Sequence, residues 1–419
     1  MNARPLVLII ALMSACAVDV RASADPRSPA SLQQEGQDTC GGSGARPTLV
    51  RRAGAQPPPE TRREADGNDA GDKATVKFEG LKTLAEKDVL YALRARNAGV
   101  CESFDYDPAK VEHAVRILKE YLASRGFLHA TVDVREELVA TPKVVTFVIN
   151  EGERAHIAEI HFEGNKGVPN ARLVEEVQAC LDRSADSLKE EKGLYDADRL
   201  DYCLGTAARQ LLSSEGYLQA KVGKPRTEEV KRGLIITVPV AEGLRYRLGK
   251  IKIEDATVFL PEQIIEMLDV KTGKVVDGEK IMEWLSDRVA GEYLDRGYVQ
   301  YEAFIDPVFK TPASRKDEGV VDLRIYIQEG KPFTVASIEF EGNRLKTDEE
   351  LKSAFSLEEG DVFSRRKFLD GLERLHQLGV FDGFFEGTFN NSRYKGVDFS
   401  FNDQEKLISI KIKIDESNR

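Results

Sequence analysis

The sequence predicts an α+β chain of four tandem β-α-α-β-β modules, each a three-stranded mixed sheet with two helices on one face. Short motifs recur in a fixed order about 81 to 91 residues apart, and the hydrophobic pattern changes in the same order within each repeat. The length of 419 residues corresponds to about three or four compact units. The expected units, called one to four, are residues 73–153, 154–243, 244–331 and 332–417.

Three motif series define the repeat. In units one, two and four a Phe-Glu-Gly motif follows the first strand and begins at Phe78, Phe162 and Phe340. In unit three Ile253-Glu254-Asp255 takes its place. A Glu-Gly pair closes the first three units: Glu151, Glu242 and Glu329. A glycine leads into the second strand of every unit, with an aromatic residue directly after it in the first three: Gly126, Gly216, Gly297 and Gly379. Three series in phase indicate one module repeated four times.

The first half of each module should be a strand and then a helix. The opening segment alternates between apolar and polar residues, which is the period of a half-buried strand. Thr83 with Glu86, and Thr347 with Glu350, have the spacing of a helix capping box. Pro261 suits the first turn of its helix.

The second half should be a longer helix and two more strands. In unit one, Asp107-Pro108 begins this helix and Gly126 ends it, with an apolar stripe between them. An alternating strand follows the glycine. The last strand is rich in β-branched residues, as in 144–149, which fits a central strand with a neighbour on each side.

This arrangement resembles the polypeptide-transport-associated (POTRA) domain. The features that carry the resemblance are the β-α-α-β-β order, the F-x-G-N sequence after strand one and the G-[FY] pair before strand two. The resemblance covers Lys73 to about Ser417. It implies a likeness to the periplasmic part of BamA-type and TamA-type outer-membrane assembly proteins. Only Asn418 and Arg419 follow the fourth unit, so a membrane barrel is not expected here.

The resemblance implies that the function is binding. A three-stranded sheet whose last strand is in the middle leaves the second strand as an edge, which can accept an extended segment by β-augmentation. Candidate edges are 128–135, 218–222 and 299–305. The third is favoured because Phe304, on the polar side of its alternation, would be an exposed apolar contact; the alternative is that Phe304 packs on a neighbouring unit. Pro307 limits this edge by removing one donor. The predicted partner-binding residues are Val299, Gln300, Tyr301, Glu302, Ala303, Phe304 and Ile305.

The first residues indicate export. A charge at Arg4, an apolar run and the small residues Ala22-Ser23-Ala24 are typical of a signal peptide over 1–24. The alternative is a lipid anchor on Cys16, because the preceding residues resemble a lipobox. The segment 25–72 has few large apolar residues and is expected to be a disordered linker. Either reading places the mature chain in the periplasm, in the second case associated with the outer membrane.

The five cysteines of an exported chain suggest disulfides. Cys180 and Cys203 fall on the apolar stripes of the two helices of unit two, so a bond between them is predicted. Cys40 and Cys101 could pair or stay free.

No nucleotide-binding, hydrolase or metal-binding motif is recognisable, so neither an enzyme nor a cofactor is expected. The net charge of −11 disfavours nucleic acid as a partner. The resemblance implies unfolded outer-membrane protein clients, with a separate β-barrel protein or lipoproteins as further partners. The alternative function is that of a structural envelope protein that contacts the cell-division or peptidoglycan machinery.

Overall fold

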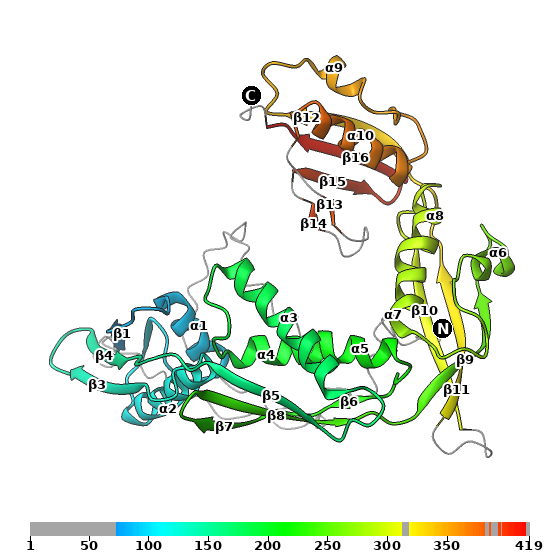
Figure 1. The fold of residues 1–419 in the computed structure, drawn as a ribbon. Helices are drawn as coiled ribbons and strands as arrows, with labels where there is room; N and C mark the ends of the chain where they lie inside the picture. Colours follow the sequence, from blue (N-terminus) through cyan, green and yellow to red (C-terminus); the bar gives the residue numbers. More distant parts are fainter. Residues whose placement is uncertain (1–72, 312–317, 382–384, 387–392, 395, 416–419) are drawn as a thin grey trace, which may run out of the picture.

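The computed structural model describes residues 73–311, 318–381, 385–386, 393–394 and 396–415. The predicted signal peptide, the linker, Cys16 and Cys40 lie outside these residues. The described chain forms four principal sheets in succession, and each takes its strands from one of the four predicted ranges. Figure 1 shows them following one another along a curved path.

Units one and two are built from these elements. Unit one contains β1 (Lys73–Glu79), α1 (Glu86–Ala95), β2 (Ser103–Asp105), α2 (Pro108–Ser124), β3 (Thr131–Glu137) and β4 (Lys143–Asn150). Unit two contains β5 (Ile157–Glu163), α3 (Asn170–Leu188), α4 (Ala197–Cys203), the π-helical turn η3 (Leu204–Ala208), α5 (Arg209–Ser214), β6 (Lys221–Val222), β7 (Arg226–Val230) and β8 (Gly233–Ala241). The segments α4, η3 and α5 are consecutive parts of the second helix.

Units three and four repeat the order. Unit three contains β9 (Arg245–Glu254), α6 (Pro261–Glu266), α7 (Gly278–Glu283), the π-helical turn η4 (Trp284–Val289), α8 (Ala290–Leu294), β10 (Glu302–Lys310) and β11 (Glu318–Gln328). Unit four contains β12 (Thr334–Glu341), α9 (Asp348–Lys352), α10 (Arg365–Gln377), β13 (Phe385–Glu386), β14 (Arg393–Tyr394), β15 (Val397–Asn402) and β16 (Leu407–Lys413).

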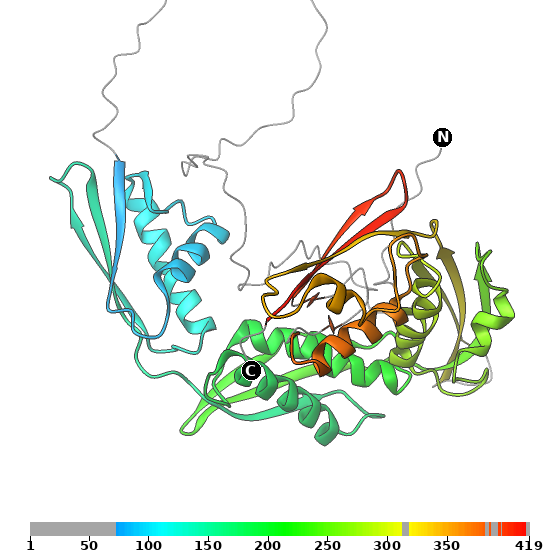
Figure 2. The same ribbon diagram turned by 90° about the horizontal axis from the view of Figure 1, so that it is seen from above.

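Every unit has the predicted mixed sheet. The last strand lies in the middle, parallel to the first strand and antiparallel to the second. In Figure 2 the helices of unit one, drawn in blue and cyan, lie against one face of its strands. Apolar side chains from that face and from the helices form the core of the unit.

Three details differ from the prediction. Unit one has four strands, because β2 pairs with β1. In unit two the second strand is split into β6 and β7, and the gap lies opposite Pro239 of the middle strand. Proline has no N–H to donate, which interrupts the ladder there. Unit four has an additional short hairpin, β13 with β14.

Helix starts follow the predicted signals in three of four cases. Asp107 caps α2, Thr347 forms a capping box on α9, and Pro261 occupies the first turn of α6. The capping box predicted at Thr83 is wrong. The helix begins at Glu86 without a side-chain cap, because the backbone N–H of Thr83 hydrogen-bonds to a carboxylate at the end of β4.

The apolar cores continue across all three junctions. Leu128, from the end of unit one, packs on the core of unit two, and Leu218, from the end of unit two, belongs to the core of units three and four. Those last two units share one continuous core. Consecutive units are therefore in direct apolar contact.

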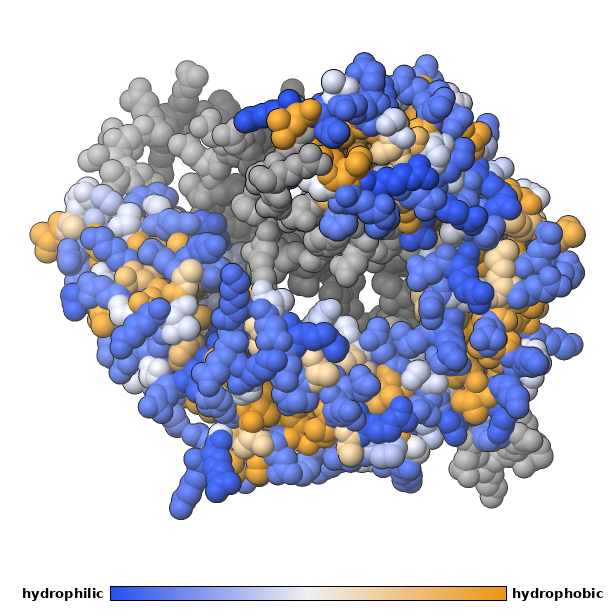
Figure 3. All heavy atoms as spheres, turned by 45° about the horizontal axis from the view of Figure 1, so that its top comes forward, coloured by the Kyte–Doolittle hydropathy of each residue, from blue (hydrophilic) through white to orange (hydrophobic). Residues whose placement is uncertain are grey.

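The surface seen in Figure 3 is mainly hydrophilic, with apolar side chains gathered in several separate areas. Among the described residues, no helix combines the length and the apolar character needed to cross a bilayer.

Candidate functional site

The second strand of each unit lies at an edge of its sheet. This holds for β3, β6 with β7, β10 and β15, each of which pairs with the last strand of its unit. The opposite edge is partly covered. In unit one β2 pairs with the first strand, and in the other three units a single bridge from the loop before the second helix meets the start of that strand. The second strands are thus the longer open edges.

The predicted edge in unit three is only partly correct. Glu302, Ala303, Phe304 and Ile305 lie in β10, which continues through Pro307 to Lys310. An edge strand tolerates the missing proline N–H.

Val299, Gln300 and Tyr301 do not belong to the strand. Val299 is 5% exposed and lies in the core, and the Tyr301 hydroxyl donates a hydrogen bond to the Leu285 carbonyl at 3.3 Å. Gln300 Nε2 donates to Asp403 Oδ1 of unit four at 2.9 Å. The segment after the glycine therefore packs in the core and at the junction.

Phe304 is half-buried on the outer face of the unit-three sheet. It lies opposite Tyr326 of β11, while its neighbours Ala303 and Ile305 point into the core. Glu302 and Asp306 share its face. The outer face of β10 therefore combines an aromatic side chain with carboxylates at an open strand edge.

The other two predicted edges are displaced toward the C-terminus. In unit one the strand covers Thr131–Glu137 instead of 128–135, and in unit two it covers Lys221–Val222 and Arg226–Val230 instead of 218–222. The residues directly after the glycine, such as Leu128 and Leu218, pack at the junctions. The strands therefore begin later than the alternation predicted.

The glycine before the second strand forms the same contact at three junctions. Its carbonyl oxygen accepts a hydrogen bond of 2.8 Å from a backbone N–H of the next unit, in the pairs Gly126 with Ala155, Gly216 with Tyr246, and Gly297 with Phe333. Each glycine has a positive φ, and a Cβ at Gly126 would lie 2.6 Å from the Tyr195 carbonyl oxygen. A side chain would therefore push neighbouring units apart.

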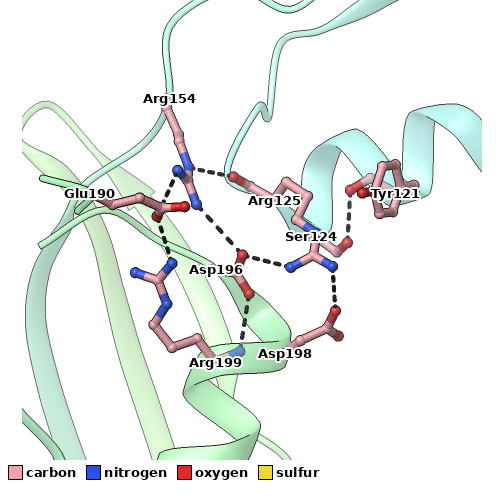
Figure 4. Close-up of polar contacts among 8 residues, drawn as sticks. All are labelled: Tyr121, Ser124, Arg125, Arg154, Glu190, Asp196, Asp198 and Arg199. Carbon is pink, nitrogen blue, oxygen red and sulfur yellow. Dashed lines mark hydrogen bonds and ion pairs between the residues drawn. The ribbon is translucent and has the colours of Figure 1, made fainter. Parts of the chain in front are cut away.

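A charged cluster reinforces the junction between units one and two (Figure 4). Asp196, which caps α4, is 4% exposed and accepts a hydrogen bond from Arg125 at 2.8 Å. Arg154 donates to the Arg125 carbonyl at 2.7 Å and to Glu190 at 3.2 Å, and Glu190 also binds Arg199 at 2.6 Å. Burial alone would lower the pKa of Arg125, but the hydrogen bond and charge of Asp196 outweigh it and raise the pKa above its ordinary value. This cluster fixes the orientation of the two units.

The cluster was not predicted from the sequence, because its members are up to 74 residues apart. A usable signal was the recurrence of an arginine shortly after the closing Glu-Gly pair. Arg245 donates to the Glu215 carbonyl at 2.8 Å, as Arg154 does to the Arg125 carbonyl.

The glutamates of the Glu-Gly motif are buried structural anchors. Glu151 is 3% exposed and accepts hydrogen bonds from three successive backbone N–H groups, those of Lys82, Thr83 and Leu84. Glu242 does the same in unit two, with Lys166, Gly167 and Val168. Glu329 binds the N–H groups of Thr257 and Val258 and the Tyr293 hydroxyl. The glutamate of this motif therefore holds the loop after strand one.

The structure brings Cys180 and Cys203 together in a disulfide, with Cα atoms 5.7 Å apart. It joins α3 to the end of α4. Cys101 is also disulfide-bonded.

Residues 74–152 and 333–417 match the POTRA family model, described as a surface antigen variable number repeat. The match covers units one and four. The chain is similar to the outer membrane protein assembly factor BamA of Neisseria meningitidis serogroup B, with 25% identity over 68% of this chain and 35% of that protein. It is likewise similar to BamA of Nitratidesulfovibrio vulgaris, with 24% identity over 73% of this chain and 38% of that protein.

Among solved structures, POTRA domains 3–5 of Haemophilus influenzae BamA match 62% of this chain and 96% of theirs, with 18% identity and a TM-score of 0.48. The chain spans less than two fifths of the length of the two relatives named above.

Proposed function

We propose that this POTRA array is a periplasmic docking protein that takes part in outer-membrane protein assembly. It binds extended segments of outer-membrane polypeptides, or of assembly partners, by β-augmentation at its second-strand edges. Its two BamA relatives are named as outer membrane protein assembly factors, which supports the general role. The mode of binding is inferred from the sheets themselves.

The observation that carries the proposal is the open edge of β10. This strand is nine residues long and, in the part of the chain that the structure describes, pairs only with β11, so its other side presents unpaired backbone groups. Backbone pairing tolerates many client sequences, and the half-buried Phe304 adds an apolar contact for alternate side chains of the guest.

A photocrosslinking experiment tests this mode. The full chain carries benzoylphenylalanine in place of Asp306, which is exposed on β10. The control carries it in place of Asp287, which is exposed on the helical side of the same unit. We expect light-dependent adducts with outer-membrane proteins that are several-fold stronger at Asp306.

Equal labelling at the two positions would contradict docking at β10. Recovery of cell-division or peptidoglycan proteins alone at Asp306 would instead favour the structural envelope role.

A further inference from the structure

The first strand of each unit also has an edge, and unit one indicates what can cover it. There β2 runs antiparallel to β1, with Thr75 opposite Ser103, and the N–H of Val76 donates to the Glu102 carbonyl at 3.2 Å. Val76 lies four residues before Gly80, which follows the strand. In unit one the covering strand β2 therefore extends along the edge of β1 as far as Val76.

In unit four the covering stops earlier. The loop before α10 bridges Thr334 through Val362, and the N–H of Val335 donates to the Asp361 carbonyl at 2.8 Å. The residue four places before Gly342 is Ile338, which corresponds to Val76. From Ile338 onward β12 has β16 as its only partner strand among the residues that the structure describes.

A groove of about 520 Å³ lies beside this uncovered part of β12. Its floor is formed by Ile338 of the strand and by Phe355 and Leu357 from the segment after α9. Its rim is polar and includes Ser353 and Glu358. An open strand edge next to an apolar floor is the arrangement that an added strand requires, because the edge pairs its backbone and the floor receives a side chain.

The charged residues on the rim also favour one sign of charge in a bound segment. Lys352 pairs with Glu359 at 3.2 Å. Glu358 is exposed, and among the described residues no lysine or arginine lies within ion-pair distance of it. Glu339 and Glu341 alternate with Ile338 and lie on the other face of the strand, opposite Lys411 and Lys413 of β16, so Glu358 supplies the charge of the groove. The groove therefore favours a cation in whatever occupies it.

We propose that the open edge of β12 binds an extended segment of a partner polypeptide in antiparallel pairing, as β2 covers β1 in unit one. An apolar side chain of the segment lies over Ile338 and Leu357, and a lysine or arginine two residues along, on the same face of the segment, faces Glu358. This site goes beyond the proposed function, because it uses the opposite edge of the sheet and selects its guest by charge.

The test measures binding of two synthetic peptides to the full chain by fluorescence anisotropy. Both are nine residues long, alternate valine and serine and carry a neutral fluorophore, and they differ only in a central lysine or a central glutamate. We expect the lysine peptide to bind at least tenfold more tightly than the glutamate peptide.

Two variants with exposed positions locate the site. Glu358→Lys should reverse the preference between the peptides, and Ser353→Tyr should weaken both by filling the groove. Glu373→Lys, an exposed charge reversal on α10 away from the groove, is the matched control and should behave as the native chain. Thermal unfolding of each variant checks that it is folded.

Equal binding of the two peptides, no binding to the native chain, or an unchanged preference in Glu358→Lys would overturn the proposal. Failure of the β10 docking mode would appear separately, as missing adducts at Asp306, because that experiment uses another unit and another probe.

Discussion

At the scale of single residues, the buried glutamates explain why Glu-Gly recurs. A carboxylate can accept several hydrogen bonds, and Glu151 meets three N–H groups that the loop after β1 would otherwise leave unsatisfied. The glycine that follows adopts a positive φ, which turns the chain toward the next unit.

Glu151→Gln should destabilise unit one by about 1–3 kcal/mol, because the amide offers an N–H₂ group to backbone donors that need an acceptor. Hydrogen exchange at Lys82, Thr83 and Leu84 should accelerate in this variant. Glu153→Gln, an exposed change two residues away, is the control and should leave these rates unchanged. Unchanged rates in both variants would show that the carboxylate does not hold the loop.

The same carboxylates predict sensitivity to acid. Burial alone would raise the pKa of Glu151, but hydrogen bonds from the N–H groups of Lys82, Leu84 and Thr83 outweigh it and hold the pKa below its ordinary value of 4.5. Glu329 is held low in the same way, by Thr257, Val258 and Tyr293.

Because these pKa values are lower in the folded chain, the stabilisation is complete above the unfolded pKa and is lost as the pH falls through the folded pKa. Unfolding by urea should therefore become easier below about pH 4.5, and Glu151→Gln should reduce this dependence. An identical pH profile for the variant would contradict the assignment.

Asp255 illustrates what a motif can and cannot predict. It stands where units one, two and four have glycine, and it adopts the same left-handed backbone, with φ of 64°. Aspartate tolerates this conformation better than most residues. The positions of Gly80 and Gly164 would not allow the change, since a Cβ there would approach a carbonyl oxygen within 2.0 and 2.4 Å. The repeat could thus be recognised from the sequence despite Asp255. The contacts that allow an aspartate at this position could not be predicted.

At the scale of elements, the disulfide holds the long helix of unit two. The helix α3 has 19 residues against 10 in α1, and the bond between Cys180 and Cys203 ties its second half to α4. Glu190, just beyond the end of α3, can then meet Arg154 and Arg199.

Replacing both cysteines by alanine should lower the stability of unit two by about 3 kcal/mol, as expected for a bond that closes a loop between positions 23 residues apart. Thermal unfolding with and without reductant checks this. The native chain should lose stability on reduction, and the double variant should change much less. An equal effect of reductant on both chains would assign the stabilisation to another bond.

The order and type of the elements could be predicted, but the ends of the second strands could not. Alternation identified the strands, yet Leu128 and Leu218, two places after their glycines, continue the same alternation while packing at the junctions. The break in unit two depends on Pro239, a residue of the neighbouring strand. Both effects arise from contacts between distant parts of the chain, which periodicity does not report.

At the scale of the whole molecule, the junctions determine how the edges are presented. Each pair of neighbouring units shares the glycine carbonyl contact, and the first junction adds the charged cluster around Asp196. A nearly buried carboxylate that loses its charged partner destabilises the folded chain. Single substitutions should therefore weaken this junction.

Arg125→Gln should loosen the first junction. Spin labels on Glu112 of α2 and Glu176 of α3, both exposed, report the distance between units one and two. We expect a broader distance distribution in the variant. Arg116→Gln, on the exposed side of the same helix, is the control and should keep the native distribution. Native-like widths for Arg125→Gln would mean that the backbone contact alone holds the units.

The central claim is that an extended guest pairs with the open second strands. Hydrogen–deuterium exchange of the full chain, with and without an unfolded outer-membrane protein segment, tests it most directly. The account predicts slower exchange for backbone amides of β10, with little change in the adjacent β11, whose amides are already enclosed by two strands. Protection confined to the helices, or no protection in any second strand, would contradict it.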